Sequence, residues 1–163
     1  MPRYTLPLRN NPRPDAPESV SRHVPFYCAH EAAAAAWTRA LVEACGDLLD
    51  PVTQTAVVNV VSNFGRELFT GDADVVVTLD RVGTTSLTLL ITIEQDGVQA
   101  AEVTATLVQL DSSRVNSAPW SPAQIAAFET LRDAQAVARP GPSKFQQGLI
   151  WAIDGYEYRR RAR

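Results

Sequence analysis

His30 and Glu31 are the adjacent residues whose types point most directly to chemistry, because they stand at the expected start of a helix. A carboxylate can deprotonate water or attack a carbonyl carbon, and an imidazole can orient water or donate a proton. Amide N–H groups at a helix N-terminus can polarise a carbonyl oxygen. The pair is therefore a candidate catalytic site for attack on a carbonyl. The structural alternative is that Glu31 stabilises the helix dipole in the first turn and that His30 caps the helix or packs against it.

The helix that would position this pair spans residues 32–45. It begins with five consecutive alanines, and alanine has the highest intrinsic helix propensity. Only Thr38, Arg39 and Glu43 interrupt its apolar surface, and a helix that is apolar on most sides is usually buried. About fourteen residues at ~1.5 Å each give a rod of roughly 21 Å, which a strongly curved sheet could cover. Gly46 is expected to end the helix.

β-branched residues bounded by Pro51 and Gly65 predict a strand over residues 55–64. Alternating side chains predict three further strands, over residues 73–82, 86–94 and 98–110. Asp96 and Gly97 predict a tight hairpin turn, since both residue types tolerate a positive φ. One face of the antiparallel sheet is apolar, and the alanine helix is the only good candidate to cover it. A further strand is expected over residues 22–29, at a sheet edge because of Pro25. A C-terminal helix is expected over residues 121–136.

The overall composition predicts one globular domain with tails. We assign residues 1–21 to an N-terminal arm, 22–136 to the domain and 137–163 to a C-terminal tail. The net charge of −3 favours neither nucleic acid nor an anionic membrane as a partner. The arginine-rich end, residues 159–163, invites a nucleic-acid interpretation, but a solvated tail is preferred because no aromatic residues are interleaved with it.

The location expected from the sequence is the reducing cytoplasm. Cys28 and Cys45 are too few for a disulfide framework. No apolar run approaches the ~18 residues that a membrane span needs. We assign no metal site and no cofactor.

Several segments carry a resemblance to a known family. Residues 62–72 read Ser-Asn-Phe-Gly-Arg-Glu-Leu-Phe-Thr-Gly-Asp, and residues 81–87 read Arg-Val-Gly-Thr-Thr-Ser-Leu. Val-Gln-Leu-Asp at 108–111 is followed by Pro-Trp-Ser-Pro at 119–122. Together with the order of elements, they resemble the hotdog-fold acyl-CoA thioesterase superfamily, of the 4-hydroxybenzoyl-CoA thioesterase-like kind, over roughly residues 22–131. The resemblance implies an α+β fold in which a curved antiparallel sheet wraps around a central Ala-rich helix, with a short C-terminal helix.

The sequence departs from the family pattern at its catalytic half. Many members carry an aspartate at the end of the first strand, then Gly-His-Val-Asn-Asn. Here residues 22–26 echo only His-Val, and the aspartate position would be Ser19. A second alignment takes residues 22–29 as the strand and brings an acid to the strand–helix junction, as in hotdog subfamilies whose glutamate lies on the central helix. We prefer it: the resemblance then implies Glu31 as base or nucleophile, with His30 orienting water or protonating the leaving thiolate.

The resemblance also implies binding residues. Strand-edge amides at one hairpin would pair with the pantetheine arm, here at Gly83, Thr84, Thr85 and Ser86. Arg66 and Arg81 could bind the phosphates of CoA, or could be ordinary solvated arginines. Asn59 and Asn63, expected on one face with Val57 and Val61, could line an acyl pocket or orient water. Asn63 could equally satisfy the backbone at the strand end.

The leading expectation is hydrolysis of an acyl-CoA or acyl-carrier thioester by a homodimer or a dimer of dimers. In the family the two sheets join, and the active sites lie at the seam between subunits. The alternative is a non-catalytic acyl-thioester-binding or assembly protein, which the missing strand-end aspartate supports. Hydration or dehydration of an enoyl-CoA, with His30 as base, ranks last because no Asp-x-x-x-x-His pattern accompanies it.

Overall fold

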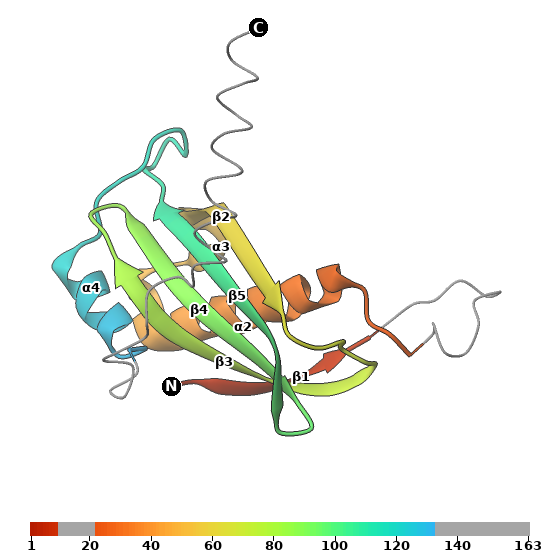
Figure 1. Cartoon of the computed structure of the whole chain (residues 1–163). Helices are drawn as coiled ribbons and strands as arrows, with labels where there is room; N and C mark the ends of the chain where they lie inside the picture. Colours follow the sequence, from red (N-terminus) through yellow and green to blue (C-terminus); the bar gives the residue numbers. More distant parts are fainter. Residues whose placement is uncertain (10–21, 133–163) are drawn as a thin grey trace, which may run out of the picture. The chain divides into compact units, whose positions relative to one another are not determined.

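A five-stranded antiparallel sheet and one long helix form the fold of the chain (Figure 1). This computed structural model describes residues 1–9 and 22–132. The strand order is β1-β3-β4-β5-β2. The strands are β1 (Arg3–Leu8), β2 (Thr55–Phe64), β3 (Gly71–Val82), β4 (Ser86–Gln95) and β5 (Val98–Gln109). The helices are α2 (Phe26–Cys45), η1 (Gly46–Leu48), α3 (Pro51–Gln54) and α4 (Pro122–Glu129).

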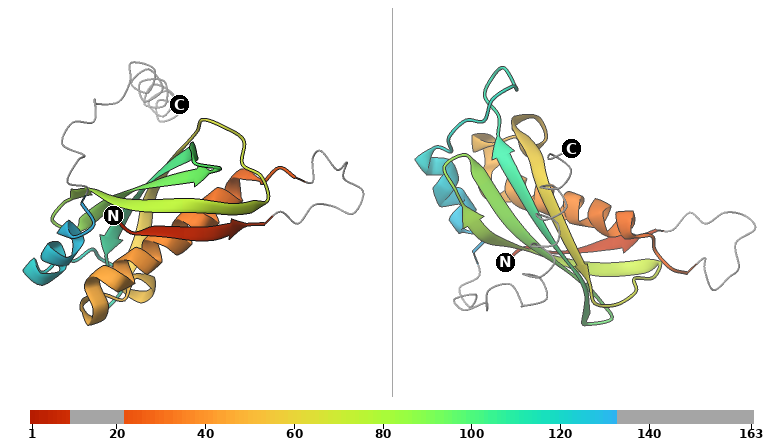
Figure 2. Two further views of the ribbon diagram at one scale, coloured as in Figure 1. Left: turned by 90° about the horizontal axis from the view of Figure 1, so that it is seen from below. Right: turned by 45° about the horizontal axis from the view of Figure 1, so that its top comes forward.

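The apolar face of the sheet packs against α2, as the sequence predicts (Figure 2). On the helix side Ala29, Ala33, Ala36 and Ala40 are at most 1% exposed. The facing sheet residues are Val75, Val77, Leu79, Leu87, Leu89, Ile91, Ile93, Val103, Ala105 and Leu107, all at most 2% exposed. Small alanine side chains let the helix lie close to the sheet, so strand side chains fill the core at high density. Both cysteines are also buried and free, and burial raises the pKa of the Cys45 thiol to about 11.

The expected strand over residues 22–29 is wrong, because this stretch opens α2 instead. Pro25 takes the N-cap position with φ −57° and ψ 147°, and the helix begins at Phe26. His30 and Glu31 consequently lie in the second turn of α2 rather than the first. The sheet edge is formed by β1, where Tyr4 pairs with Val75. The interpretation of the N-terminal residues as an arm is therefore wrong for β1, and residues 10–21 lie outside the described part.

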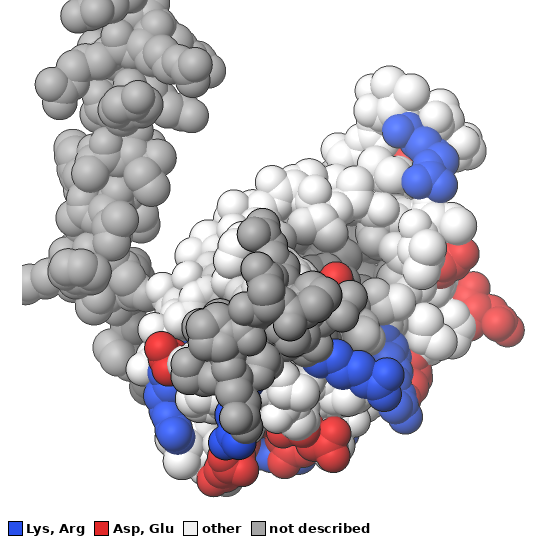
Figure 3. All heavy atoms as spheres, turned by 90° about the vertical axis from the view of Figure 1, so that its right-hand side faces the viewer, with Lys and Arg blue, Asp and Glu red and all other residues white. Residues whose placement is uncertain are grey.

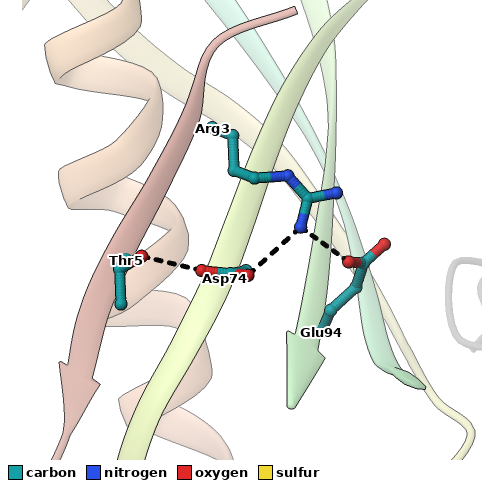
Figure 4. A network of polar contacts seen from close by, with 4 residues as sticks. All are labelled: Arg3, Thr5, Asp74 and Glu94. Carbon is teal, nitrogen blue, oxygen red and sulfur yellow. Dashed lines mark hydrogen bonds and ion pairs between the residues drawn. The ribbon is translucent and has the colours of Figure 1, made fainter. Parts of the chain in front are cut away.

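Polar contacts on both faces fasten β1 to its neighbours. On the outer face the Arg3 guanidinium donates to Asp74 at 3.2 Å and to Glu94 at 2.9 Å (Figure 4). The Thr5 hydroxyl donates to the same Asp74 carboxylate at 2.8 Å. On the inner face the Tyr4 hydroxyl donates to Glu43 of α2 at 2.7 Å, while the Arg39 guanidinium lies 4.6 Å from the Tyr4 ring centre. Burial, reinforced by the bond to Glu43, raises the pKa of Tyr4.

The C-terminal helix α4 starts where Ser121 predicts it. The Ser121 hydroxyl accepts from the Gln124 amide at 3.2 Å, and the Gln124 side chain accepts from the Ser121 amide at 2.8 Å, which is a capping box. The helix ends at Glu129, well before the predicted residue 136. Phe128 is fully buried, and its ring meets Trp120 edge-on at 4.9 Å. The predicted tail, residues 137–163, lies outside the described residues.

Candidate functional site

His30 forms the closest polar contact between α2 and the edge strand β2. Its Nε2 atom lies 2.5 Å from the Ser62 hydroxyl oxygen. Ser62 pairs across the sheet with Val103, a fully buried core residue. Because directly paired residues of antiparallel strands share a face, Ser62 points to the side of the sheet on which α2 lies. Both side chains are only partly buried, so a small molecule can reach the pair.

Two aromatic rings flank the His30 imidazole. The Phe26 ring lies 5.7 Å away edge-on, and the Phe64 ring lies 6.5 Å away in a tilted arrangement. Phe26 is one helical turn before His30, and Phe64 is the last residue of β2. Neither ring is hidden, since Phe26 is 65% exposed and Phe64 is 45% exposed. These exposed rings restrict the rotation of the imidazole and give its surroundings an apolar character.

A cavity of about 520 Å³ borders this cluster. It is lined by His23, Val24, Phe26, Phe64, Gly65, Arg66, Glu67 and Leu68. Phe26 and Phe64 belong both to the lining and to the cluster around His30, so the His30–Ser62 pair adjoins the cavity. This volume is within the range of small-molecule sites.

Backbone bonds hold the far wall of the cavity. The Val24 amide donates to the Leu68 carbonyl at 2.8 Å, and the Thr70 amide donates to the Arg22 carbonyl at 2.9 Å. The Gln95 side chain then fixes Phe69 by donating to its carbonyl at 2.9 Å and accepting from its amide at 3.0 Å. The segment between β2 and β3 is thus attached both to the start of α2 and to the sheet.

Glu31 occupies a different side of α2 from its neighbour. Successive residues of a helix are about 100° apart around its axis, and the Glu31 side chain is exposed. Burial raises the pKa of the Cys28 thiol, and the Glu31 carboxylate raises it further. The structure therefore leaves Glu31 facing outward beside the pair, on the same turn of helix, without bringing it against Ser62.

Asn59 and Asn63 lie on the outer face of the sheet. Asn59 pairs with Thr106 and Asn63 with Glu102. The expectation that Val57 shares this face is wrong, because a register shift between Val57 and Asn59 turns Val57 towards the core side, opposite Leu107. Within one chain the two asparagines consequently lie on the opposite face from His30, and their predicted role in binding stays a prediction.

The predicted CoA-binding residues lie at opposite ends of the sheet. Arg66 follows the end of β2, where Phe64 pairs with Ala101. Arg81 and the turn made of Gly83, Thr84, Thr85 and Ser86 lie at the other end, where Ser86 pairs with Val108 next to the start of β2. Since β2 has 10 residues, the two ends are roughly 33 Å apart. One chain alone does not bring these two groups together.

The turn between β3 and β4 is tightly bonded. The Gly83 amide donates to the Ser86 carbonyl at 2.8 Å, and the carbonyls of Thr84 and Thr85 accept from the amides of Trp120 and Gln109. A side-chain carbon at Gly83 would lie only 2.6 Å from the Ser86 hydroxyl oxygen, so any larger residue there would force the Ser86 side chain to turn away. These bonds hold the turn against the last strand and the segment before α4.

A second cavity, of about 580 Å³, lies at this end of the sheet. Its lining is Thr53, Gln54, Gln109, Leu110, Asp111, Ser112, Arg114 and Ala118. Hydrogen bonds from Ser113 and Asn116 lower the pKa of Asp111 to about 2. The carboxylate therefore stays ionised and organises the loop that follows β5.

Ser62, Phe26 and Phe64 are the site residues that sequence reasoning missed. Ser62 was part of the segment that carried the resemblance, but no spacing rule connects it with a histidine 32 residues earlier. Only the pairing of β2 with β5 shows which face Ser62 takes. Phe26 was hidden by the incorrect strand assignment, since a strand end would not place it one turn before His30.

The described residues show two further properties of the molecule. Within residues 1–9 and 22–132, no cluster of three or more His, Cys, Asp and Glu side chains is arranged to hold a metal ion. In the same ranges, no helix has the length and apolarity needed to cross a membrane. On the face where α2 begins, acidic and basic side chains lie close together (Figure 3), in keeping with the small net charge of −3.

Comparisons with known proteins identify the fold. No family model matches the sequence, and no curated protein matches it. Among solved structures, a predicted thioesterase from Bacillus stearothermophilus superposes with a TM-score of 0.65 at 18% identity, covering 86% of this chain and 100% of that one. A thioesterase from Thermus thermophilus, complexed with coenzyme A and Zn, gives 0.63 at 20% identity over 78% and 92%. A 1,4-dihydroxy-2-naphthoyl-CoA thioesterase from Synechocystis gives 0.62 at 15% identity over 77% and 93%.

These likenesses agree with the architecture described above. The five-stranded antiparallel sheet, the central helix α2 and the short helix α4 are the elements that the resemblance implied. The resemblance is thereby confirmed at the level of the fold. The chain has the hotdog fold that these thioesterases share.

Proposed function

We propose that this protein hydrolyses acyl-CoA thioesters. The observation that carries the proposal is the His30–Ser62 pair, whose neighbours Phe26 and Phe64 line a cavity of about 520 Å³, in a fold whose solved examples include thioesterases. One of those relatives was solved with coenzyme A bound, which supports CoA as the carrier. The pair supplies proton-transfer groups, and the cavity with its exposed phenylalanine rings supplies an apolar surface for an acyl group.

The reaction needs a polarised carbonyl and a base. Within residues 1–9 and 22–132 no side chain caps α2 at Pro25, and in this proposal the amides of Phe26 and Tyr27 polarise the carbonyl oxygen. Glu31 is the proposed base or nucleophile, because its exposed carboxylate lies on the turn that carries His30. His30 orients the water or returns a proton to the leaving group. The thiol of cysteine has a pKa of about 8.5, and a thiolate of similar basicity leaves without strong acid assistance.

A complete CoA site requires two chains in this proposal. Arg66 and the turn at residues 83–86 are too far apart to meet one CoA molecule within a single chain. In the described residues β2 pairs on one side only, with β5. Antiparallel pairing of two β2 strands around a two-fold axis would bring the end of one β2 beside the start of the other. Arg66 of one chain would then approach the strand end that carries the turn of the second chain.

The exposed apolar side chains of β2 support this seam. Val57, Val58, Val60, Val61 and Phe64 are all between 40% and 57% exposed. An edge strand with so many exposed valines is a site for pairing with another strand. The proposed assembly is therefore a homodimer joined through β2, which a dimer of dimers would also contain.

Val60→Glu should convert this dimer to a monomer, because it places a carboxylate in an apolar seam. Light scattering coupled to size exclusion would measure the change in mass. Val42→Glu is the matched control, since Val42 is 49% exposed but lies on the side of α2 away from the sheet core. A Val60→Glu protein that stays dimeric would contradict a seam at β2.

Release of free thiol from acyl-CoA tests the proposed function. The purified full chain would be incubated separately with acetyl-CoA, hexanoyl-CoA, palmitoyl-CoA and benzoyl-CoA, and the thiol followed with a chromogenic disulfide. We expect turnover with at least one of the four. No release from any of them would overturn hydrolysis; a raised melting temperature in their presence would then support the non-catalytic binding protein instead.

A further inference from the structure

The contact between His30 and Ser62 has the geometry of a nucleophile with its base. A serine hydroxyl is a weak nucleophile until a neighbouring base accepts its proton. The His30 Nε2 atom lies 2.5 Å from the Ser62 oxygen, within hydrogen-bond reach for that transfer. The two groups come from different elements, since α2 supplies the imidazole and β2 supplies the hydroxyl. Their approach depends on the packing of the helix against the edge strand, and no local sequence preference produces it.

The surroundings suit a reacting pair better than a buried structural contact. Both residues are partly exposed, and water could satisfy either group if the contact were absent. A hydrogen bond between partly exposed groups adds little to stability. The imidazole is nevertheless held by the rings of Phe26 and Phe64, which also line the adjoining cavity. His30 and Ser62 do not themselves line that cavity, but the two phenylalanines do, so an acyl group bound there would lie next to the pair.

We propose that Ser62 is the nucleophile of this site and His30 its base, so that hydrolysis passes through an acyl-Ser62 ester. The proposal rests on the thioesterase function proposed above and specifies its mechanism. In the first half, the Ser62 oxygen bonds to the thioester carbonyl carbon while its proton moves to His30 Nε2. The tetrahedral intermediate then collapses, the carbon–sulfur bond breaks, and the CoA sulfur takes the proton from the imidazolium.

In the second half, water attacks the ester and restores the enzyme. The water proton passes to a base, the carbon–oxygen bond to Ser62 breaks, and the Ser62 oxygen regains a proton. The sum is one thioester and one water converted to a carboxylic acid and a thiol. This division gives Glu31 a defined part, because its exposed carboxylate, on the same turn of α2 as His30, would activate the water of the second half. Loss of Glu31 would then leave the ester on Ser62.

Mass spectrometry of the quenched protein tests the ester directly. Wild-type and Glu31→Gln proteins would be mixed with whichever of the four acyl-CoAs releases thiol, quenched in acid during the first turnovers, and digested. We expect one acyl group on the peptide that contains Ser62, at higher occupancy in Glu31→Gln. Ser62→Ala and His30→Gln should lose the adduct and at least about a hundredfold of kcat. Ser117→Ala, which removes an exposed serine of the loop after β5, should keep both.

Two further measurements distinguish loss of the Ser62 nucleophile from misfolding. The outcomes below also distinguish failure of this mechanism from failure of the proposed thioesterase function. Ser62→Ala should melt within a few degrees of wild type, and Ser62→Cys should carry the acyl group on sulfur instead of oxygen. If wild type releases thiol but neither wild type nor Glu31→Gln carries an acyl group on Ser62, the assignment of Ser62 as nucleophile is overturned. The proposed thioesterase function would still stand. A Ser62→Ala protein with kcat within threefold of wild type would overturn the same assignment. No thiol release from any of the four substrates overturns the proposed function and, with it, this mechanism.

Discussion

Replacing Glu31 by glutamine should lower kcat for thioester hydrolysis at least about a hundredfold, the lower range for loss of a general base. Glutamine keeps the size and polarity of the side chain but cannot accept a proton. Glu31 is exposed on the second turn of α2 and makes no contribution to the core. The variant should therefore fold normally, bind substrate with little change in KM, and fail in the step that activates water.

Glu43→Gln is the matched control for this variant. It removes one carboxylate from the same helix, where Glu43 accepts from Tyr4 and Arg39 at a distance from the site. We expect its kcat to stay within threefold of wild type. Steady-state thiol release at saturating acyl-CoA measures both proteins. A loss smaller than a hundredfold in Glu31→Gln would show that the carboxylate is not the base.

Phe128→Ala should lower the free energy of unfolding by about 3–5 kcal/mol, as is typical for removal of a fully buried phenylalanine. The Phe128 side chain is 0% exposed and packs edge-on against Trp120 at 4.9 Å. Its removal leaves a cavity where α4 meets the rest of the core. Trp120 would lose its aromatic neighbour, and its indole N–H already has no hydrogen-bond partner among the described residues.

Urea denaturation followed by tryptophan fluorescence would measure this loss. Ile125→Ala on the same helix is the control, because Ile125 is 36% exposed and truncating it should cost less than about 1 kcal/mol. Equal losses in the two variants would show that the burial of Phe128 does not set the contribution of α4.

The central sheet could be predicted from the sequence because its signals are local. β4 and β5 alternate apolar and polar residues over much of their length, and β2 and β3 are rich in valine, which favours strands. β1 lacks this advantage, since it has only six residues and contains Pro7. An edge strand tolerates a proline that a central strand would exclude. The start of α2 could not be predicted from residue type, because Phe26 and Tyr27 favour a strand. In the structure both lie in the first turn of the helix and are exposed.

Only the part of the candidate site that lies on a single element, the helix α2, could be predicted from the sequence. His30 and Glu31 stand in a recognisable place beside the alanine run, so their types were enough to suggest chemistry. The contact with Ser62 depends on which face of β2 each residue takes. The register shift between Val57 and Asn59 changes that assignment for part of the strand, and nothing in the local sequence reveals it.

The alanines of α2 also determine where a substrate cannot go. Ala29, Ala33, Ala36 and Ala40 are each at most 1% exposed, and such close packing of helix on sheet disfavours a hydrocarbon tail between them. An acyl group bound beside His30 has to run outward past Phe26 and Phe64. Selectivity for chain length would therefore be set at the surface, by exposed side chains that can change without disturbing the core.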